Sequence, residues 1–297
     1  MRSCVLAQGT RPGFSYCHAL KRSQAEKLGA CLPANPANPE PFAVRSPFPR
    51  ALPSFSQTAN YQWSNYNAAF ARFEQRVWKG LSVTSAYTYG KLIDSGGAGQ
   101  NMYDRRPERG LADNDIRHNF IAGFVSDLPA GKGKWIDLQN KALDLVLGGW
   151  QFNGIANFRT GAPFSVTTAG DLARVGSGSQ RPNATGVPAR KIDPRTNGLL
   201  GLDRAAYSTP AVGTFGTAAR NTQPGFGVNQ WDISMAKNFP VGPLGENGKL
   251  QLRFEWFNFF NHTQFFNPIA TQNATTFGRV TAAADPRILQ IAGRLQW

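Results

Sequence analysis

Hydrophobic and polar residues alternate with a period of two along most of the chain from residue 65 onward, in runs that end in turn residues. Such alternation indicates extended strands with one apolar and one polar face. The first run places Ala69, Ala71 and Phe73 on one side and Arg72 and Glu74 on the other. An eighth strand is indicated more weakly near 55–63. The clear runs predict seven strands, at 65–78, 81–92, 117–128, 149–159, 231–238, 249–260 and 289–297.

The connections between these runs alternate in length. Three are short or of middling length, at 79–80, 129–148 and 240–248. The other three are long, at 93–116, 160–228 and 261–285. In an antiparallel meander all the long loops would fall at one end, as in outer-membrane barrels with short periplasmic turns and long external loops. The predicted fold class is therefore all-β: a fragment of an antiparallel up-and-down transmembrane β-barrel, of about seven or eight strands, with long loops on one side.

Composition agrees with a chain of many strands and turns. Gly 31 and Pro 20, with 12% aromatic and 17% charged residues among 297, are typical of strands joined by turns. No run approaches the roughly 18–20 apolar residues of a membrane-spanning helix, which excludes a helical membrane protein. The first twenty residues lack the apolar core of a secretory signal.

The N-terminal segment 1–44 differs from the rest. Its Pro and Asn clusters ("LPANPANPEP") and lack of periodicity predict irregular or disordered structure. Cys4, Cys17 and Cys31 all lie there and form neither a CxxC pair nor a zinc-ligand pattern with His18. The role of this segment stays open.

The net charge of +14 suits an anionic partner such as nucleic acid, lipid head groups or an acidic glycan. The basic residues are scattered singly or in short pairs, without the Lys/Arg-rich run typical of nucleic-acid binding. We therefore expect no nucleic-acid partner.

The stretch "RFEWFNFFNHTQFF" (253–266) concentrates aromatic rings at the upper end of a predicted strand. In a barrel, rings at this height form an interfacial girdle, with one wet and one apolar side. The alternative is an aromatic core in a soluble or surface-exposed β-sandwich that acts as an adhesion or glycan-binding module. The predicted girdle residues are Trp256, Phe257, Phe259 and Phe260.

The polar faces of two strands carry charges at alternate positions. On the inner wall of a barrel such residues can pair across neighbouring strands and form a polar ladder that contacts a plug; the alternative is simple solvation of the wall. The predicted lumen-facing ladder residues are Arg72, Glu74, Arg76, Arg253 and Glu255.

Catalytic and metal-binding signals are weak. Asp113, Asp115 and His118 in "LADNDIRHNF" are close enough for a metal or acid/base hypothesis, but carboxylates before a strand more often bond to backbone amides of a turn. His262 is interpreted as a hydrogen-bonded loop anchor. No nucleophile, phosphate-loop or HExxH motif is present, so we expect no enzyme and no cofactor or metal. Three loop arginines are possible contacts for lipopolysaccharide phosphates or are simply solvated: Arg105, Arg106 and Arg109.

Six ordered blocks give the chain a family resemblance. "SNYNAAFARFEQRVWKGLSVTSAYTYGKLID", "ERGLADNDIRHNFIAGFVSDLPAGKGK", "GGWQFNGIANFRTGAPFSV", "FGTAARNTQPGFGVNQWDISMAKNF", "LRFEWFNFFNHTQF" and "FGRVTAAADPRILQIAGRLQW" follow one another along about 45–297. In this order they resemble the C-terminal half of Oar-like TonB-dependent receptor barrels. The final strand also resembles the signal that directs bacterial barrel proteins into the outer membrane, with Leu289, Ile291, Leu295 and Trp297 at its positions.

The resemblance implies localisation in the outer membrane and a large barrel that imports a solute past a plug. Its implied partners are outer-membrane lipid and lipopolysaccharide, a plug domain with further barrel strands, and the TonB complex. From its sequence we expect the chain to lack the signal peptide, plug and first barrel half of the family. Because open sheet edges leave backbone groups unpaired in lipid, we expect 45–297 to be part of a larger barrel, from a truncated or mis-started frame, and unable to transport alone. The solute stays unidentified.

Overall fold

The computed structural model describes residues 62–77, 80–96, 99–101, 104–131, 134, 136, 140–176, 179–190, 193–241 and 248–296. The segment 1–44, its cysteines, nearly all of the weaker strand at 55–63 and Trp297 lie outside these residues. In the described part of the chain, no helix is long and apolar enough to cross a membrane.

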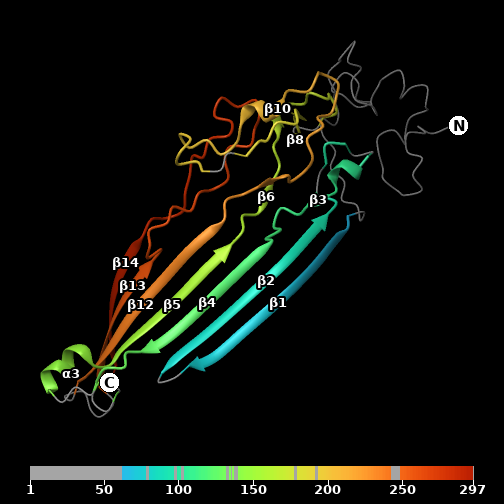
Figure 1. Cartoon of the computed structure of the whole chain (residues 1–297). Coiled ribbons are helices and arrows are strands. Elements are labelled where there is room, and N and C mark those ends of the chain that lie inside the picture. Colours follow the sequence, from blue (N-terminus) through green and yellow to red (C-terminus); the bar gives the residue numbers. More distant parts are fainter. Residues whose placement is uncertain are drawn as a thin grey trace, which may run out of the picture.

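Seven long strands form one antiparallel sheet in sequence order (Figure 1). This meander confirms the predicted fold class, and its strands fall within a few residues of the predicted ranges. The one clear shortening is at 249–260, where the strand ends at Phe257 because Asn258 adopts a positive φ of 51°. The strands are β1 (Ser64–Val77), β2 (Leu81–Asp94), β4 (His118–Asp127), β5 (Trp150–Arg159), β12 (Val228–Pro240), β13 (Lys249–Phe257) and β14 (Ile288–Gln296).

Short elements lie in the connections. At the short-turn end, α3 (Lys141–Leu147) interrupts the link between β4 and β5. At the opposite end, β3 (Gly110–Leu111) pairs with β2, and three two-stranded ladders form among the remaining pieces. These pieces are η3 (Arg106–Glu108), β6 (Pro163–Phe164), β7 (Thr168–Ala169), β8 (Ser179–Gln180), β9 (Asn183–Ala184), η4 (Arg204–Ala206), β10 (Tyr207–Ser208) and β11 (Gln223–Pro224).

The cross-strand register aligns the apolar residues of all seven strands on one face. In β2 and β4, for example, Val83 faces Phe124 and Tyr87 faces Phe120, and in β13 and β14 Trp256 faces Leu289. Paired residues of neighbouring strands point to the same side of a sheet. The sheet therefore has one continuous apolar face and one largely polar face, as the period-two pattern predicts.

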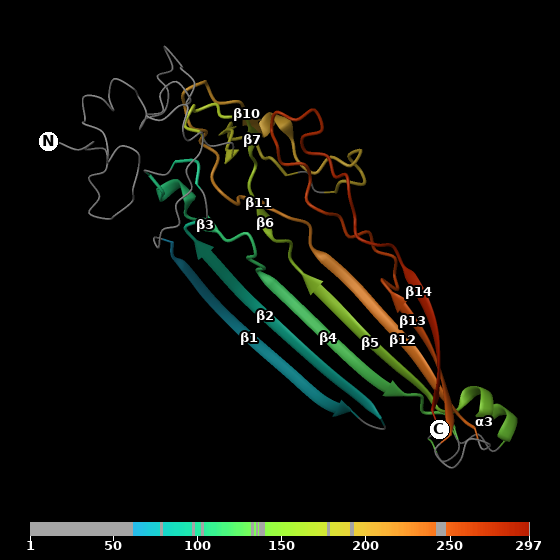
Figure 2. The same cartoon turned by 180° about the vertical axis from the view of Figure 1, so that it is seen from behind.

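The apolar face is not covered by a second layer in the described part of the chain, as the two opposite views show (Figures 1 and 2). Large side chains on it are accordingly exposed, with Phe73 at 52%, Ile291 at 64% and Leu295 at 48%. In a soluble sandwich these residues would meet in a dry centre between two sheets. The single layer excludes the sandwich alternative.

The sheet has two open edges. In the described part of the chain β1 pairs only with β2, and β14 pairs only with β13. Both edge strands are exposed over nearly their whole length. An open edge presents a row of unpaired backbone N–H and C=O groups, which lipid cannot satisfy.

Candidate functional site: the outer rim and its loop cap

The described residues of the three long connections pack together at one end of the sheet (Figure 2). We call them the loop cap; they are the described residues within 95–117, 160–227 and 258–287. The main hydrophobic core of the described residues lies here and not on the sheet. Tyr207 meets Phe277 edge to face at 6.0 Å, and burial raises the pKa of the Tyr207 hydroxyl. The core residues are Val166, Ala189, Leu202, Ala206, Tyr207, Ala218 and Phe277.

A buried ion pair joins the first and second loops of the cap. The guanidinium of Arg181 meets both carboxylate oxygens of Glu108, at 2.6 Å and 3.1 Å, and the two side chains are only 7% and 3% exposed. Arg181 Nε also donates to Ala218 O at 2.8 Å, and Gln100 N donates to the Glu108 carboxylate at 3.2 Å. A bidentate pair of this kind fixes the relative orientation of the two side chains and also strengthens the interaction between them. The two loops are therefore held in one arrangement.

A second polar cluster anchors the cap to the end of β2. Arg220 pairs with Asp94 and, at 3.1 Å, with Asp113. Its neighbour Asn221 is 3% exposed and donates to Leu111 O at 2.7 Å and to Asp113 Oδ1 at 2.6 Å. Asn221 has a φ of 50°, in the left-handed region that asparagine enters more readily than most residues.

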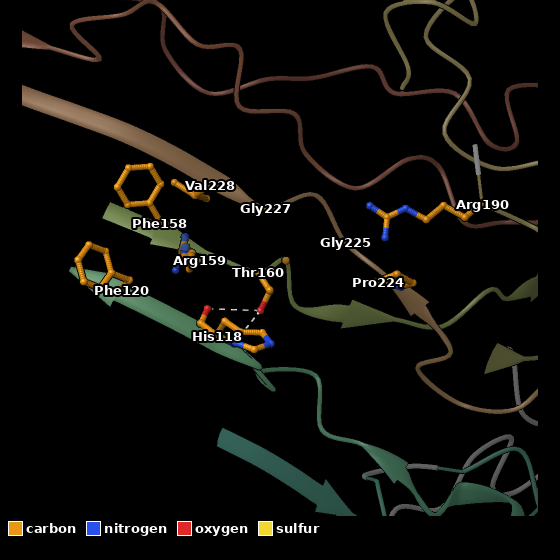
Figure 3. A pocket seen from close by; sticks show the side chains of 11 residues that line it. His118, Phe120, Phe158, Arg159, Thr160, Arg190, Pro224, Gly225, Gly227 and Val228 are labelled. Carbon is orange, nitrogen blue, oxygen red and sulfur yellow. Dashed lines mark hydrogen bonds between the residues drawn. The ribbon is translucent and has the colours of Figure 1, made fainter. Parts of the chain in front are cut away.

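A pocket of about 400 Å³ opens where β4, β5 and β12 run into the loop cap (Figure 3). Aromatic rings of Phe120 and Phe158 form one side, and Arg190 approaches from the loop opposite. In the described part of the chain, the guanidinium groups of Arg159 and Arg190 have no acidic partner. The complete lining is His118, Phe120, Phe158, Arg159, Thr160, Gly161, Arg190, Pro224, Gly225, Gly227 and Val228.

This lining suits a particular kind of ligand. Ligand pockets combine apolar walls with a few polar groups that fix orientation. Guanidinium groups beside aromatic rings can hold an anionic group and an adjoining apolar portion. The pocket is open to the long-loop end, which is the external side of an outer-membrane barrel.

The predicted triad of Asp113, Asp115 and His118 is not assembled. Asp115 is 4% exposed and accepts a 2.6 Å hydrogen bond from Leu92 N. This is a bond to backbone, as expected, but it reaches β2 and does not lie within the turn that contains Asp115. Asp113 belongs instead to the Arg220 cluster. His118 begins β4, and its Nδ1 lies 2.8 Å from Tyr87 Oη. The His262 ring lies close to β12, with Nδ1 3.4 Å from Asn229 O, and its backbone N–H donates to Asn258 Oδ1 at 2.9 Å. Both contacts tie the residue into its loop.

The three loop arginines all have contacts within the chain. Arg105 donates to Ser95 O at 3.0 Å and Gly96 O at 3.1 Å, and Arg109 lies over the ring of Trp63 at 5.8 Å. Arg106 pairs with Asp104 at 2.9 Å, and its hydrogen bonds hold the pKa of that carboxyl below its usual value. Phosphate binding by these arginines remains a prediction, and each would have to share or give up an existing contact.

A row of ring contacts crosses the upper apolar face. It runs from Phe120 through Phe158, Trp231, Phe260 and Phe259 to Trp256, with centroids 5.2–6.2 Å apart. The predicted girdle residues Trp256, Phe259 and Phe260 lie in this row. Phe257 does not: its register partner is Ile288, so it lies on the other face with Glu255. Adjacent residues of a strand point to opposite faces, which the run of aromatic letters hides.

The predicted polar ladder lies on the polar face, but it does not pair across strands. Arg72 bonds to Glu74 at 2.9 Å and Arg253 to Glu255 at 3.4 Å, each within one strand. Cross-strand pairing fails because the facing residues are small or uncharged: Arg72 faces Ala86, Glu74 faces Thr84, Arg76 faces Ser82, Arg253 faces Ala236 and Ala292, and Glu255 faces Ser234 and Gln290.

Leu289, Ile291 and Leu295 of the predicted insertion signal share the apolar face of β14, opposite Trp256, Phe254 and Leu250 of β13. Their role in insertion stays a prediction. Sequence reasoning missed the Glu108–Arg181 pair, the Asn221 cluster and α3. The ion pair joins positions 73 residues apart and has no local pattern, whereas Gly148–Gly149 after an apolar run is a usable helix-end signal for α3.

A lipid-facing apolar side, a polar side and a cap of long loops at one end define an outer-membrane β-barrel protein. The family model described as "Outer membrane beta barrel domain" matches residues 16–290. The chain therefore belongs to this family, and its place is the outer membrane. Neither the curated proteins nor the solved structures compared with the chain gave a match.

Proposed function

We propose that this chain forms the C-terminal wall of an Oar-like TonB-dependent transporter, which binds a solute at its outer face and imports it. The observation that carries the proposal is the exposure of the charged side chains on the polar face, which would form the inner wall of the barrel. Arg72, Glu74 and Arg253 are 64%, 61% and 47% exposed on the polar face. In a small closed barrel such side chains fill the lumen and pack against one another.

An exposed inner wall with two open edges supports a wide barrel. Further strands would satisfy the free edges of β1 and β14, and a plug would cover the polar wall. The six ordered sequence blocks supply the TonB-dependent part of the proposal.

Cross-linking in native outer membranes tests the architecture. Lys249 is exposed on the polar face, in register with Gln296 and Pro240. An amine-reactive cross-linker should join Lys249 to a plug-type polypeptide, and the unheated protein should migrate as a species larger than 32.4 kDa. A protein that migrates as a 32.4 kDa monomer and whose Lys249 forms no cross-link to another polypeptide would contradict the proposal.

Transport is tested separately with the intact bacterium. A strain without the gene for this chain and a strain without TonB should leave the same solutes in the growth medium, as measured by mass spectrometry. A solute whose uptake needs this chain but not TonB would argue for a passive barrel instead.

A further inference from the structure

The short helix α3 lies at the short-turn end of the sheet (Figure 1). Two side chains of the apolar face hold its last turn. Trp150 Nε1 donates to Val146 O at 2.9 Å, and Lys237 Nζ donates to Gly148 O at 2.5 Å. Trp150 and Lys237 are register partners and so point to the same side of the sheet.

The Lys237 ammonium is enclosed by this arrangement. The residue is 2% exposed, and its Nζ lies 5.6 Å from the Trp150 ring and 5.1 Å from the Phe239 ring. A cation is favourable at a helix C-terminus and over aromatic faces, and a lysine stem can pass along apolar surface to reach such a site. The helix end is therefore fixed at the rim of the apolar face.

Four apolar side chains of the same helix are largely exposed in the described part of the chain. Leu143, Leu145, Val146 and Leu147 are 48%, 57%, 63% and 47% exposed, although all are apolar. Asp144, the acidic residue of α3, is only partly exposed. Water is a poor solvent for such a surface, and contiguous exposed apolar side chains indicate a partner.

The geometry points to the phospholipid of the inner leaflet as that partner. We infer that α3 is an interfacial anchor, which lies at the periplasmic boundary of the bilayer with its leucines and valine among the acyl chains. The inference rests on the outer-membrane family and on the short turns marking the periplasmic side. The lipid-facing side of the sheet continues directly into the helix through Trp150, a residue type enriched at membrane boundaries.

Spin labelling of the full chain tests this inference. Cys4, Cys17 and Cys31 are replaced by serine, and a nitroxide is attached at Leu145→Cys in vesicles of phosphatidylethanolamine and phosphatidylglycerol. Collisions with oxygen report lipid, and collisions with a water-soluble nickel chelate report water. The matched controls are labels at Ile291→Cys, on the apolar face, and Lys249→Cys, at the same end of the sheet but on the polar face.

We expect the oxygen-to-nickel collision ratio at position 145 to exceed that at 249 and to approach that at 291. Adding Leu143→Asn and Val146→Asn should lower the ratio at 145 and leave that at 291 unchanged. A ratio at 145 equal to that at 249, with 291 still in lipid, overturns the anchor but not the barrel. Water exposure at both 145 and 291 overturns the anchor together with the orientation on which it rests.

Discussion

Replacing Arg181 with methionine should open the loop cap while leaving the sheet in place. The substitution keeps most of the apolar stem but removes the guanidinium bonds to Glu108, to Ala218 O and to Pro107 O. Because Glu108 is 3% exposed, its carboxylate would then be buried without a counter-charge. Water has to enter the cap to solvate that charge.

The magnitude follows from the burial of the pair. Removing one partner of a buried ion pair costs about 3–5 kcal/mol. At 1.36 kcal/mol per factor of ten, this is a rise of roughly two to three and a half powers of ten in the opening equilibrium of the cap. The free energy of opening of the wild-type cap sets an upper limit to this rise, because amide protection from exchange cannot fall below that of an open loop.

Hydrogen exchange of the full chain in membranes, read by mass spectrometry, measures the change. Peptides covering 179–190 and 212–221 should exchange faster in Arg181→Met, while those from β4 and β5 should not change. The matched control is Arg195→Met in the same loop, whose ion pair with Asp193 is exposed, at 67% and 35%. Exposed pairs contribute about 0–1 kcal/mol, so this control should exchange almost as the wild type does.

A double variant separates the buried charge from the lost packing. Glu108→Met combined with Arg181→Met removes both charges, and exchange should fall between that of the wild type and that of Arg181→Met. Equal exchange in Arg181→Met and Arg195→Met would refute the argument, because it would mean that burial of the pair has no energetic consequence.

Two further predictions concern the sheet. Ile291→Arg puts a charge on the lipid-facing side near the middle of β14 and should make membrane insertion less favourable by about 2–4 kcal/mol. The control Gln290→Arg, on the polar side, should have little effect. Equal folded fractions of the two variants on unheated gels would refute the assignment of faces. Gly154→Ala would push a methyl group into the Phe124 ring and should lower the urea midpoint of unfolding. In the control Gly123→Ala the added Cβ would lie 3.9 Å from its nearest atom, so the midpoint should not change. The same midpoint for both variants would contradict the close packing of the Phe124 ring against Gly154.

The sheet could be predicted because its information is local. Each strand carries its two faces in consecutive residues, and the alternation of short and long links gives the meander. The polar ladder was only half predictable: the face of Arg72 follows from periodicity, but its partner depends on register, which puts Ala86 opposite it. The side of Phe257 is local information: Phe257 follows Trp256 directly within β13, so the two rings point to opposite faces.

The loop cap could not be predicted, since its contacts are not local. Arg181 lies in a Gly- and Ser-containing stretch that looks like a plain loop, and nothing nearby in the sequence identifies Glu108 as its partner. Asn221 is recognisable as a turn residue, but its bonds to Leu111 and Asp113 span more than a hundred positions. The partners of buried polar residues in long loops can therefore be identified only from the structure.

The distribution of burial explains how such a chain can be stable at its outer end and dependent on partners elsewhere. The loop cap has its own apolar core and a buried ion pair, so its packing comes from its own loops. The sheet has no such core: its apolar face needs lipid, and the edges of β1 and β14 need other strands. Assembly of the barrel should therefore change hydrogen exchange at the two edge strands much more than in the cap, because only the edges gain backbone bonds when neighbours are added.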